Sequence, residues 1–142
     1  MPSNRADKLT YLFLAWLIAL ISTATAVFLG EIMGQPPCDL CWYQRIAMFP
    51  LAVILGIANF RDDATAWIYA LPLAVAGSVL ALVHTTTYLS ALPEVIEVAR
   101  TMGPSCTDRS MQVMGIPLPL LSLASFLSMT ALLTTVSIKD HS

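Results

Sequence analysis

Four apolar stretches, each long enough to cross a lipid bilayer, constrain this chain of 142 residues more than any other feature. A helix needs about 20 mainly apolar residues to cross the hydrocarbon core, and in lipid every backbone N–H and C=O has to be satisfied within its own helix. The expected spans are about 9–30, 42–60, 64–89 and 116–138. We therefore predict an all-α, polytopic membrane protein, an antiparallel bundle of four transmembrane helices in which residues 1–142 form a single membrane domain.

The composition agrees with a chain that lies mostly in membrane lipid. Hydrophobic residues make up 57% of the chain and charged residues 11%, whereas a soluble domain carries about 25% charged residues. The net charge is -2 and the chain has no basic run. This excludes nucleic acid as a partner, because binding to phosphates needs clustered lysine and arginine. The first apolar stretch is longer than the core of a typical signal peptide, so we expect it to remain as a span.

The connections and their charges set the expected topology. Arg61-Asp62-Asp63 is a tight polar turn, which forces the second and third spans to run antiparallel. The positive-inside rule favours cytoplasmic termini, with the cysteine loops on the outer side. In the last outer loop, residues 93–99 combine apolar side chains with two acidic ones, a pattern that suits a short helix lying on the membrane interface. The basic residues divide four to three, with Arg5, Lys8, Arg61 and Lys139 on the side of the termini and Arg45, Arg100 and Arg109 on the other.

A CxxC motif, Cys38-Asp39-Leu40-Cys41, stands at the outer edge of the second span. A structural zinc ion would need four ligands, but the third cysteine, Cys106, is alone in its loop and His84 lies in an apolar span. We therefore predict no metal site. A redox role needs only two thiols that can form and break a disulfide, and the motif meets that need. An inert disulfide that staples the outer loops is the alternative.

Arg45 follows Cys41 by four positions, which places both side chains on one face of a helix. A guanidinium within the apolar boundary is costly, so a functional role is the default interpretation. A cation and a helix N-terminus beside Cys41 would both favour its thiolate form. The same guanidinium could donate to a carbonyl oxygen of a bound electron acceptor. The alternative is an arginine that extends to the lipid headgroups and has no further role.

Three motifs together resemble the disulfide bond formation protein B (DsbB) family, of the type with a short second loop, over almost the whole chain. Residues 37–45, Pro-Cys-Asp-Leu-Cys-Trp-Tyr-Gln-Arg, are similar to its first outer-loop motif. Residues 103–109 resemble the second-loop cysteine region, and residues 115–119 resemble the proline-bearing entry to the last helix. His84 stands where members often carry a histidine near the outer end of the third span. A packed, hydrogen-bonded histidine is the other interpretation of His84.

The resemblance implies a function and roles for individual residues. Such proteins are oxidases of the cell inner (plasma) membrane that reoxidise a thioredoxin-like disulfide donor outside the membrane and pass two electrons to ubiquinone or menaquinone. By this resemblance Cys38 and Cys41 are the quinone-coupled pair, and Arg45 polarises the quinone ring. His84 would lie at the quinone site as well. Cys106 matches the second cysteine of the loop pair that the reduced donor attacks.

The chain departs from the family pattern at one position of the second loop. Two cysteines are expected there, six or seven residues apart, but the window before Cys106 holds Ala99 and Arg100. An alanine at 99 is what a deliberate cysteine replacement would leave, and a natural loss is the alternative. We expect Cys106 to pair with Cys38 instead, which leaves the Cys41 thiolate facing the quinone. A mixed disulfide between Cys106 and a trapped donor is the other possible state.

Two other functions are compatible with a four-helix membrane protein that carries a CxxC. A vitamin K epoxide reductase-like enzyme would place its quinone-proximal CxxC at the start of the fourth span. Here the motif begins the second span, and the fourth opens with Ile116-Pro117-Leu118. A non-enzymatic membrane scaffold would use its outer disulfide only to join loops.

Overall fold

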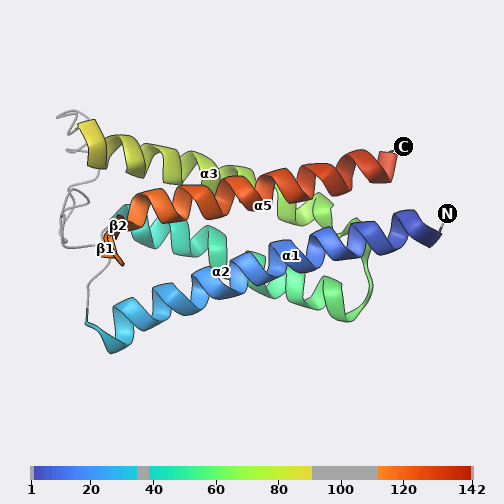
Figure 1. Ribbon diagram of the computed structural model, residues 1–142, viewed down its shortest axis with the longest axis horizontal. Coiled ribbons are helices and arrows are strands. Elements are labelled where there is room, and N and C mark those ends of the chain that lie inside the picture. The colour runs from blue at the N-terminus through green and yellow to red at the C-terminus, as the bar shows by residue number, and fades with distance from the viewer. Residues whose placement is uncertain (1, 35–38, 91–111, 142) are drawn as a thin grey trace.

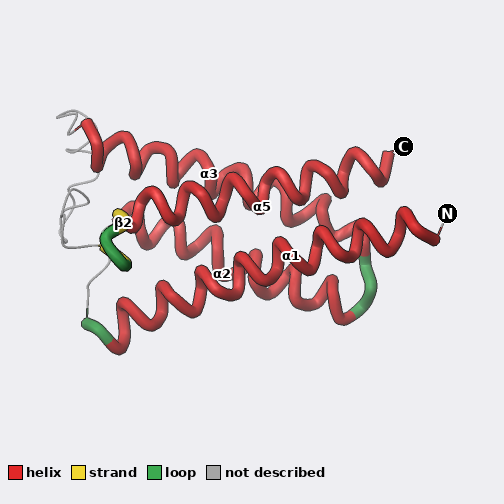
Figure 2. Tube along the Cα trace, in the orientation of Figure 1, coloured by secondary structure: helices red, strands yellow, loops and turns green. Residues whose placement is uncertain are grey.

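Four long helices form an antiparallel bundle in the computed structural model, which describes residues 2–34, 39–90 and 112–141 (Figure 1). Each of the four is long and apolar enough to cross a membrane. The start of α1 and the end of α5 lie at the same end of the bundle (Figure 2). The prediction of an all-α membrane bundle with four spanning helices is confirmed. The helices are α1 (Pro2–Val27), α2 (Asp39–Phe60), α3 (Trp67–Ser90) and α5 (Leu118–His141).

Several short elements adjust the helix ends. A π-helical turn, η1 (Phe28–Ile32), extends α1, and a 3-10 turn, η2 (Ala64–Ala66), precedes α3. Strands β1 (Gln112–Val113) and β2 (Ile116–Pro117) pair as a small antiparallel hairpin.

Helix boundaries differ from the expected spans for local reasons. Helix α5 begins two residues later than expected because 116–117 are engaged in the hairpin. Helix α2 begins at Asp39, which brings the second cysteine of the CxxC inside the helix. The interfacial helix expected at 93–99 lies outside the described residues, and the assignment of 1–142 to one membrane domain stays a prediction.

The helices pack in a ring, so that each contacts two neighbours. Helix α1 packs against α2 and α5, and α3 packs against the same two. Small side chains are prominent inside, which lets the backbones approach closely where lipid gives no hydrophobic drive for association. Large apolar side chains on the outer faces stay exposed for lipid contact. Buried alanines include Ala15, Ala19, Ala70, Ala74 and Ala81, and exposed apolar residues include Ile21, Val53, Ile57 and Val79.

At Gly77 the backbone of α3 lies very close to a side chain of α5. A Cβ at this position would overlap the ring of Phe126, a fully buried residue of α5. The ring is rigid and enclosed by the other helices, so it has little room to move. The absence of a side chain at 77 therefore sets the distance between α3 and α5.

We expect Gly77→Ala to lower the free energy of unfolding by about 1–3 kcal/mol, because the added methyl forces the Phe126 ring and its neighbours apart. Reversible unfolding in detergent would measure the change. Ala76→Val, on the exposed face of the same helix, is the matched control and should unfold like the parent protein. Equal stability of Gly77→Ala and Ala76→Val would contradict tight packing at 77.

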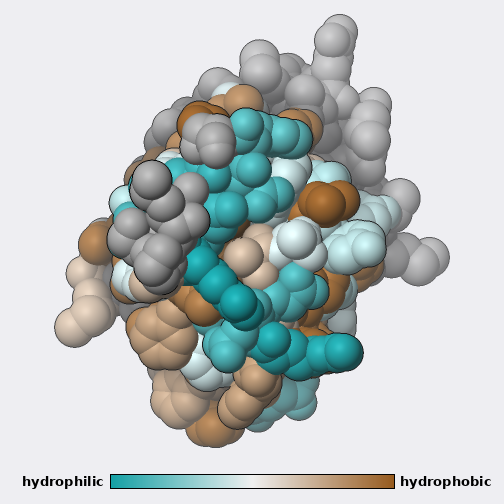
Figure 3. All heavy atoms as spheres, turned by 90° about the vertical axis from the view of Figure 1, so that its right-hand side faces the viewer, coloured by the Kyte–Doolittle hydropathy of each residue, from teal (hydrophilic) through white to brown (hydrophobic). Residues whose placement is uncertain are grey.

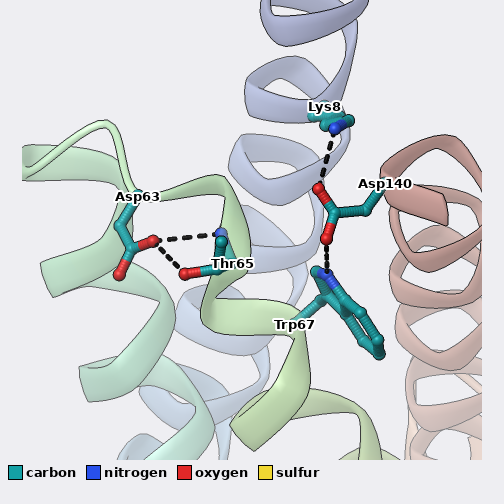
Figure 4. Close-up of polar contacts among 5 residues, drawn as sticks. All are labelled: Lys8, Asp63, Thr65, Trp67 and Asp140. Carbon is teal, nitrogen blue, oxygen red and sulfur yellow. Dashed lines mark hydrogen bonds and ion pairs between the residues drawn. The ribbon is translucent and has the colours of Figure 1, made fainter.

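The end of the bundle that carries the termini is joined by polar contacts. Lys8 Nζ lies 2.8 Å from Asp140 Oδ1, and Trp67 Nε1 donates to Asp140 Oδ2 at 3.2 Å (Figure 4). Lys139 and Asp7 form a longer ion pair of 3.7 Å. Hydrophilic residues gather at this end face of the molecule (Figure 3). These contacts link α1, α3 and α5 where the chain leaves the apolar region.

Asp63 begins the turn into α3 at the same end. Its carboxylate accepts hydrogen bonds from the Thr65 hydroxyl and from the Thr65 backbone N–H, at 3.0 Å for the latter (Figure 4). These two bonds, with a smaller contribution from Arg61, hold the pKa of Asp63 below its ordinary value. The carboxylate form is therefore favoured by folding.

The lowered pKa of Asp63 predicts a defined loss of stability in acid. Its contribution is fully present above the unfolded carboxyl pKa of about 3.9 and is lost as the pH falls through the lower folded value. We expect the stability difference between the parent and Asp63→Asn to shrink over that window. Thr65→Val removes the main cause of the shift and should flatten the profile. A difference that stays constant from pH 7 to pH 2 would contradict this role.

Candidate redox site at the start of α2

Cys41 lies in the first turn of α2 and is buried, with 7% of its surface exposed. It forms a small apolar cluster with Leu40 of its own helix, against which Val83 of α3 and Leu118 of α5 pack. This cluster lies where three helices meet, at the end of the bundle opposite the ion pairs. Cys38 and Cys106 lie outside the described residues, so their pairing stays a prediction.

Arg45 stands one turn further along α2, on the same helix face as Cys41. Its Nη2 donates to the backbone carbonyl of Ala26 at 2.8 Å, and its guanidinium lies 5.3 Å from the centre of the Trp42 ring. No carboxylate pairs with it among the residues that the structure describes. A carbonyl dipole and an aromatic face therefore stabilise this cation without neutralising it. Its charge remains available to a ligand.

The π-helical turn η1 shapes the place where Arg45 meets α1. Such turns interrupt the regular i to i-4 ladder and often occur at functional sites. Here the Met33 backbone N–H donates to the Phe28 carbonyl, five residues back, at 3.1 Å. Within this turn Gly30 faces the guanidinium, and a Cβ there would lie 2.9 Å from Arg45 Nη2. Gly30 therefore allows Arg45 to reach the backbone of α1.

A cavity of about 290 Å3 lies between α1, α2 and α5, beside these residues. Its volume is at the lower end of the range for small-molecule sites. Most of the wall is apolar, and Arg45 provides its positive charge among the described residues. The lining residues from α1 and η1 include Ile21, Ser22, Thr25, Ala26 and Leu29, those from α2 include Cys41, Gln44, Arg45, Met48 and Phe49, and those from α5 include Leu118, Ser122, Ser125 and Phe126.

His84 of α3 lies behind this wall rather than in it. It is almost fully buried, at 1% exposed, and its Nδ1 lies 3.0 Å from Nε2 of Gln44. The two side chains are thus within hydrogen-bond distance of each other inside the bundle. Gln44, also buried, lines the cavity and connects His84 to it.

The structure brings together some of the residues that the sequence singles out. Cys41 and Arg45 line one cavity, whereas His84 reaches it only through Gln44. The sequence does not single out Gln44 as a site residue. Its position next to Arg45 in the first motif is the sequence signal that could have identified it. Gly30 carries no sequence signal of this kind, because its role depends on how α1 and α2 pack. Among the described residues no group of three metal-ligating side chains is found.

Comparison with known proteins identifies the family. Residues 8–136 match the family of disulfide bond formation protein DsbB. The chain belongs to the DsbB family. A probable disulfide formation protein of Metapseudomonas resinovorans is 52% identical over 126 residues, which cover 88% of each chain. No solved structure matches the chain.

More distant relatives carry similar names. Probable disulfide formation protein C 2 of Bacillus anthracis is 38% identical over 91% of both chains. A probable disulfide formation protein of Coxiella burnetii is 36% identical over 92% of this chain and 89% of its own. Membership and these relatives support a role in disulfide-bond formation, as a disulfide oxidoreductase in a multi-pass membrane protein.

The contact between Gly30 and Arg45 leads to a mutational prediction. Gly30→Ala should displace the guanidinium from Ala26 and from the Trp42 ring, because the far end of an arginine moves more easily than the backbone. The free energy of unfolding should change by no more than about 1 kcal/mol, since alanine favours helix over glycine. With the other two tryptophans replaced by phenylalanine, the emission of Trp42 would report the displacement.

Ala24→Val, on the exposed face of α1, is the control for Gly30→Ala because it adds volume away from Arg45. Its Trp42 emission should equal that of the parent. If Gly30→Ala leaves both the emission and the stability unchanged, the guanidinium does not lie against Gly30.

Proposed function

We propose that this protein is a membrane thiol oxidase that reoxidises a thioredoxin-fold disulfide donor outside the membrane and passes the electrons to a membrane quinone, ubiquinone or menaquinone. One observation carries the proposal. A mostly apolar cavity that could receive a ring has a cysteine and an unneutralised arginine in its wall, and both project from the first turns of one helix. Membership of a disulfide-forming family supplies the thiol half of the reaction.

The size, polarity and position of the cavity support a quinone as its ligand. Its volume of about 290 Å3 suits a small ring, and its apolar wall suits a lipid-soluble molecule. Ile21 lines the cavity and is 63% exposed, so the cavity reaches the lipid-facing surface of α1. An isoprenoid chain can extend from there into the bilayer.

Arg45 and Cys41 would each have a task at the bound quinone. Arg45 would donate to a carbonyl oxygen of the ring and would stabilise the negative charge that develops there during reduction. Trp42 and the Ala26 carbonyl hold the guanidinium in place. Cys41, which lines the same cavity, would supply the sulfur that faces the ring. When bound, the quinone supplies a two-electron acceptor, so two thiols become one disulfide and their two electrons and two protons yield the quinol.

The outer cysteines complete the proposed pathway. We propose that Cys38 is the partner of Cys41 in quinone reduction and that Cys106 is the second-loop residue that exchanges with Cys38. The donor's thiolate would attack a disulfide of the second loop, and this chain has alanine at 99 where its second cysteine is expected. Full turnover therefore requires that cysteine to be restored.

We propose that the protein lies in the cell inner membrane with its termini in the cytoplasm. Lys8 and Lys139 project at the end of the bundle that carries the termini, together with Arg5 of α1. Lysine and arginine concentrate on the cytoplasmic side of membrane proteins. The site at the start of α2 is at the opposite, outer end.

Quinone reduction by purified protein tests the proposed function. In the Ala99→Cys background, addition of a reduced thioredoxin-fold donor should convert ubiquinone-1 or menaquinone-1 to its quinol. A scaffold would reduce neither quinone, and that result would overturn the proposal. A matched sample with Cys41→Ser should be inactive, because the ring-facing sulfur is missing.

Arg45 provides a quantitative test of the site. Arg45→Ala should weaken quinone binding by about tenfold or more, as expected for loss of a hydrogen bond from a charged group. Arg61→Ala, at the opposite end of the bundle, is the control and should bind like the parent. Binding is measured by quinone quenching of tryptophan fluorescence. Equal affinity of the Arg45→Ala variant and the parent would remove Arg45 from the site.

A further inference from the structure

Hydroxyl side chains of α1 and α5 face the cavity, and most of them already use their protons within their own helix. Thr25 Oγ1 donates to the Ile21 carbonyl at 2.8 Å, and Ser122 and Ser125 donate to carbonyls of α5, each at 2.9 Å. Such bonds to the preceding turn are usual for serine and threonine in helices. These hydroxyls therefore present oxygen lone pairs rather than protons to the cavity.

Ser22 is different among the described cavity residues. Its Oγ donates across the contact between α1 and α5 to Ser125 Oγ, at 3.3 Å. That distance is longer than the usual range of about 2.5–3.0 Å for an O–H···O bond. In apolar surroundings a weakly bonded hydroxyl gains from a better acceptor. Ser22 thus offers a hydrogen-bond donor to whatever enters the cavity.

The position of Ser22 is related to that of Arg45 through α1. Ser22 and Ala26 are four residues apart on one helix face, about 6 Å along the axis. Arg45 Nη2 donates to the Ala26 carbonyl, and both Ser22 and Arg45 line the cavity. The guanidinium also faces Gly30, one turn beyond Ala26, so the two donors lie between one and two helical turns apart along α1 on the wall of one cavity. A ring with two oxygens at opposite corners can meet both.

We infer that Ser22 is a second binding residue for the electron acceptor, and that it donates a hydrogen bond to the quinone carbonyl opposite the one that Arg45 receives. The inference rests on the proposed function, because it assumes a quinone in the cavity. Both ubiquinone and menaquinone carry two opposite ring carbonyls, whereas only ubiquinone carries methoxy groups. A bond to the carbonyl is therefore independent of the quinone type.

The role of Ser125 follows from its own bonds. It donates to the Leu121 carbonyl and accepts from Ser22, so its lone pairs hold the Ser22 hydroxyl between the two helices when the cavity is empty of acceptors. A ligand carbonyl competes with Ser125 for one proton. The exchange leaves no buried hydroxyl proton without an acceptor.

Binding of ubiquinone-1 and menaquinone-1 to the purified full chain, followed by quenching of tryptophan fluorescence, tests the inference. We expect Ser22→Ala to weaken the binding of both quinones by about threefold to tenfold, the usual net effect of one neutral hydrogen bond. Ser22→Thr keeps the hydroxyl and should bind like the parent. The readout is an equilibrium affinity and does not depend on turnover.

Ser78→Ala is the matched control for packing. Ser78 Oγ lies 3.1 Å from Thr130 Oγ1, so a hydroxyl pair also joins α3 and α5, although each of these hydroxyls also bonds a carbonyl of its own helix, and neither residue lines the cavity. Ser78→Ala and Ser22→Ala should lose similar stability, but only Ser22→Ala should lose affinity. Equal affinities in these two variants would overturn the inference.

The outcomes separate this inference from the proposed function. If the parent protein binds neither quinone, the proposed function is wrong. If the parent binds and Arg45→Ala weakens binding while Ser22→Ala does not, the quinone site stands and the role of Ser22 is wrong. A loss confined to ubiquinone-1 would also overturn the inference, because it would assign the Ser22 bond to a methoxy oxygen.

Discussion

The hydrogen bond from Arg45 to the Ala26 carbonyl is the interaction on which the site depends. A guanidinium near the edge of the hydrocarbon needs partners, and a carboxylate partner would cancel the charge that the proposed reaction needs. A backbone carbonyl holds the group and leaves its net charge intact. The other local features support this choice, since the π-helical turn and Gly30 open α1 at the point where the guanidinium arrives.

Polar groups elsewhere in the bundle are likewise bonded to backbone carbonyls. Hydroxyls in the spans mostly donate to the carbonyl one turn earlier, as Thr85 does to Ala81 and Thr130 does to Phe126. Most polar side chains can then be present in lipid with their protons bonded, although the buried Thr23 hydroxyl of α1 has no hydrogen-bond partner among the described residues. Contacts between helices, such as Ser78 with Thr130, add specificity to a packing that otherwise relies on alanine and glycine.

The sequence was enough to predict the four spans. In lipid a single chain segment can satisfy its own backbone hydrogen bonds only as a helix, and a long apolar stretch in the sequence marks such a helix directly. The sequence also predicted that Cys41 and Arg45 share a helix face, since the helical repeat alone decides this. It could not predict that Gly30 meets Arg45, that Ser22 faces Ser125 or that His84 lies behind Gln44. Those relations depend on helix rotation and on η1, which no local pattern records.

The ion-paired end of the bundle has a mechanical consequence for the opposite end. Lys8 and Asp140 fasten α1 to α5 at one extremity, and Trp67 fastens α3 to the same carboxylate. Toward the other extremity α1 and α5 are held by the long Ser22 to Ser125 contact and by packing around a cavity. The contact between α1 and α5 is therefore fixed by charged groups at one end and by weaker contacts at the cavity end, where the described residues offer the least resistance to separation of the two helices.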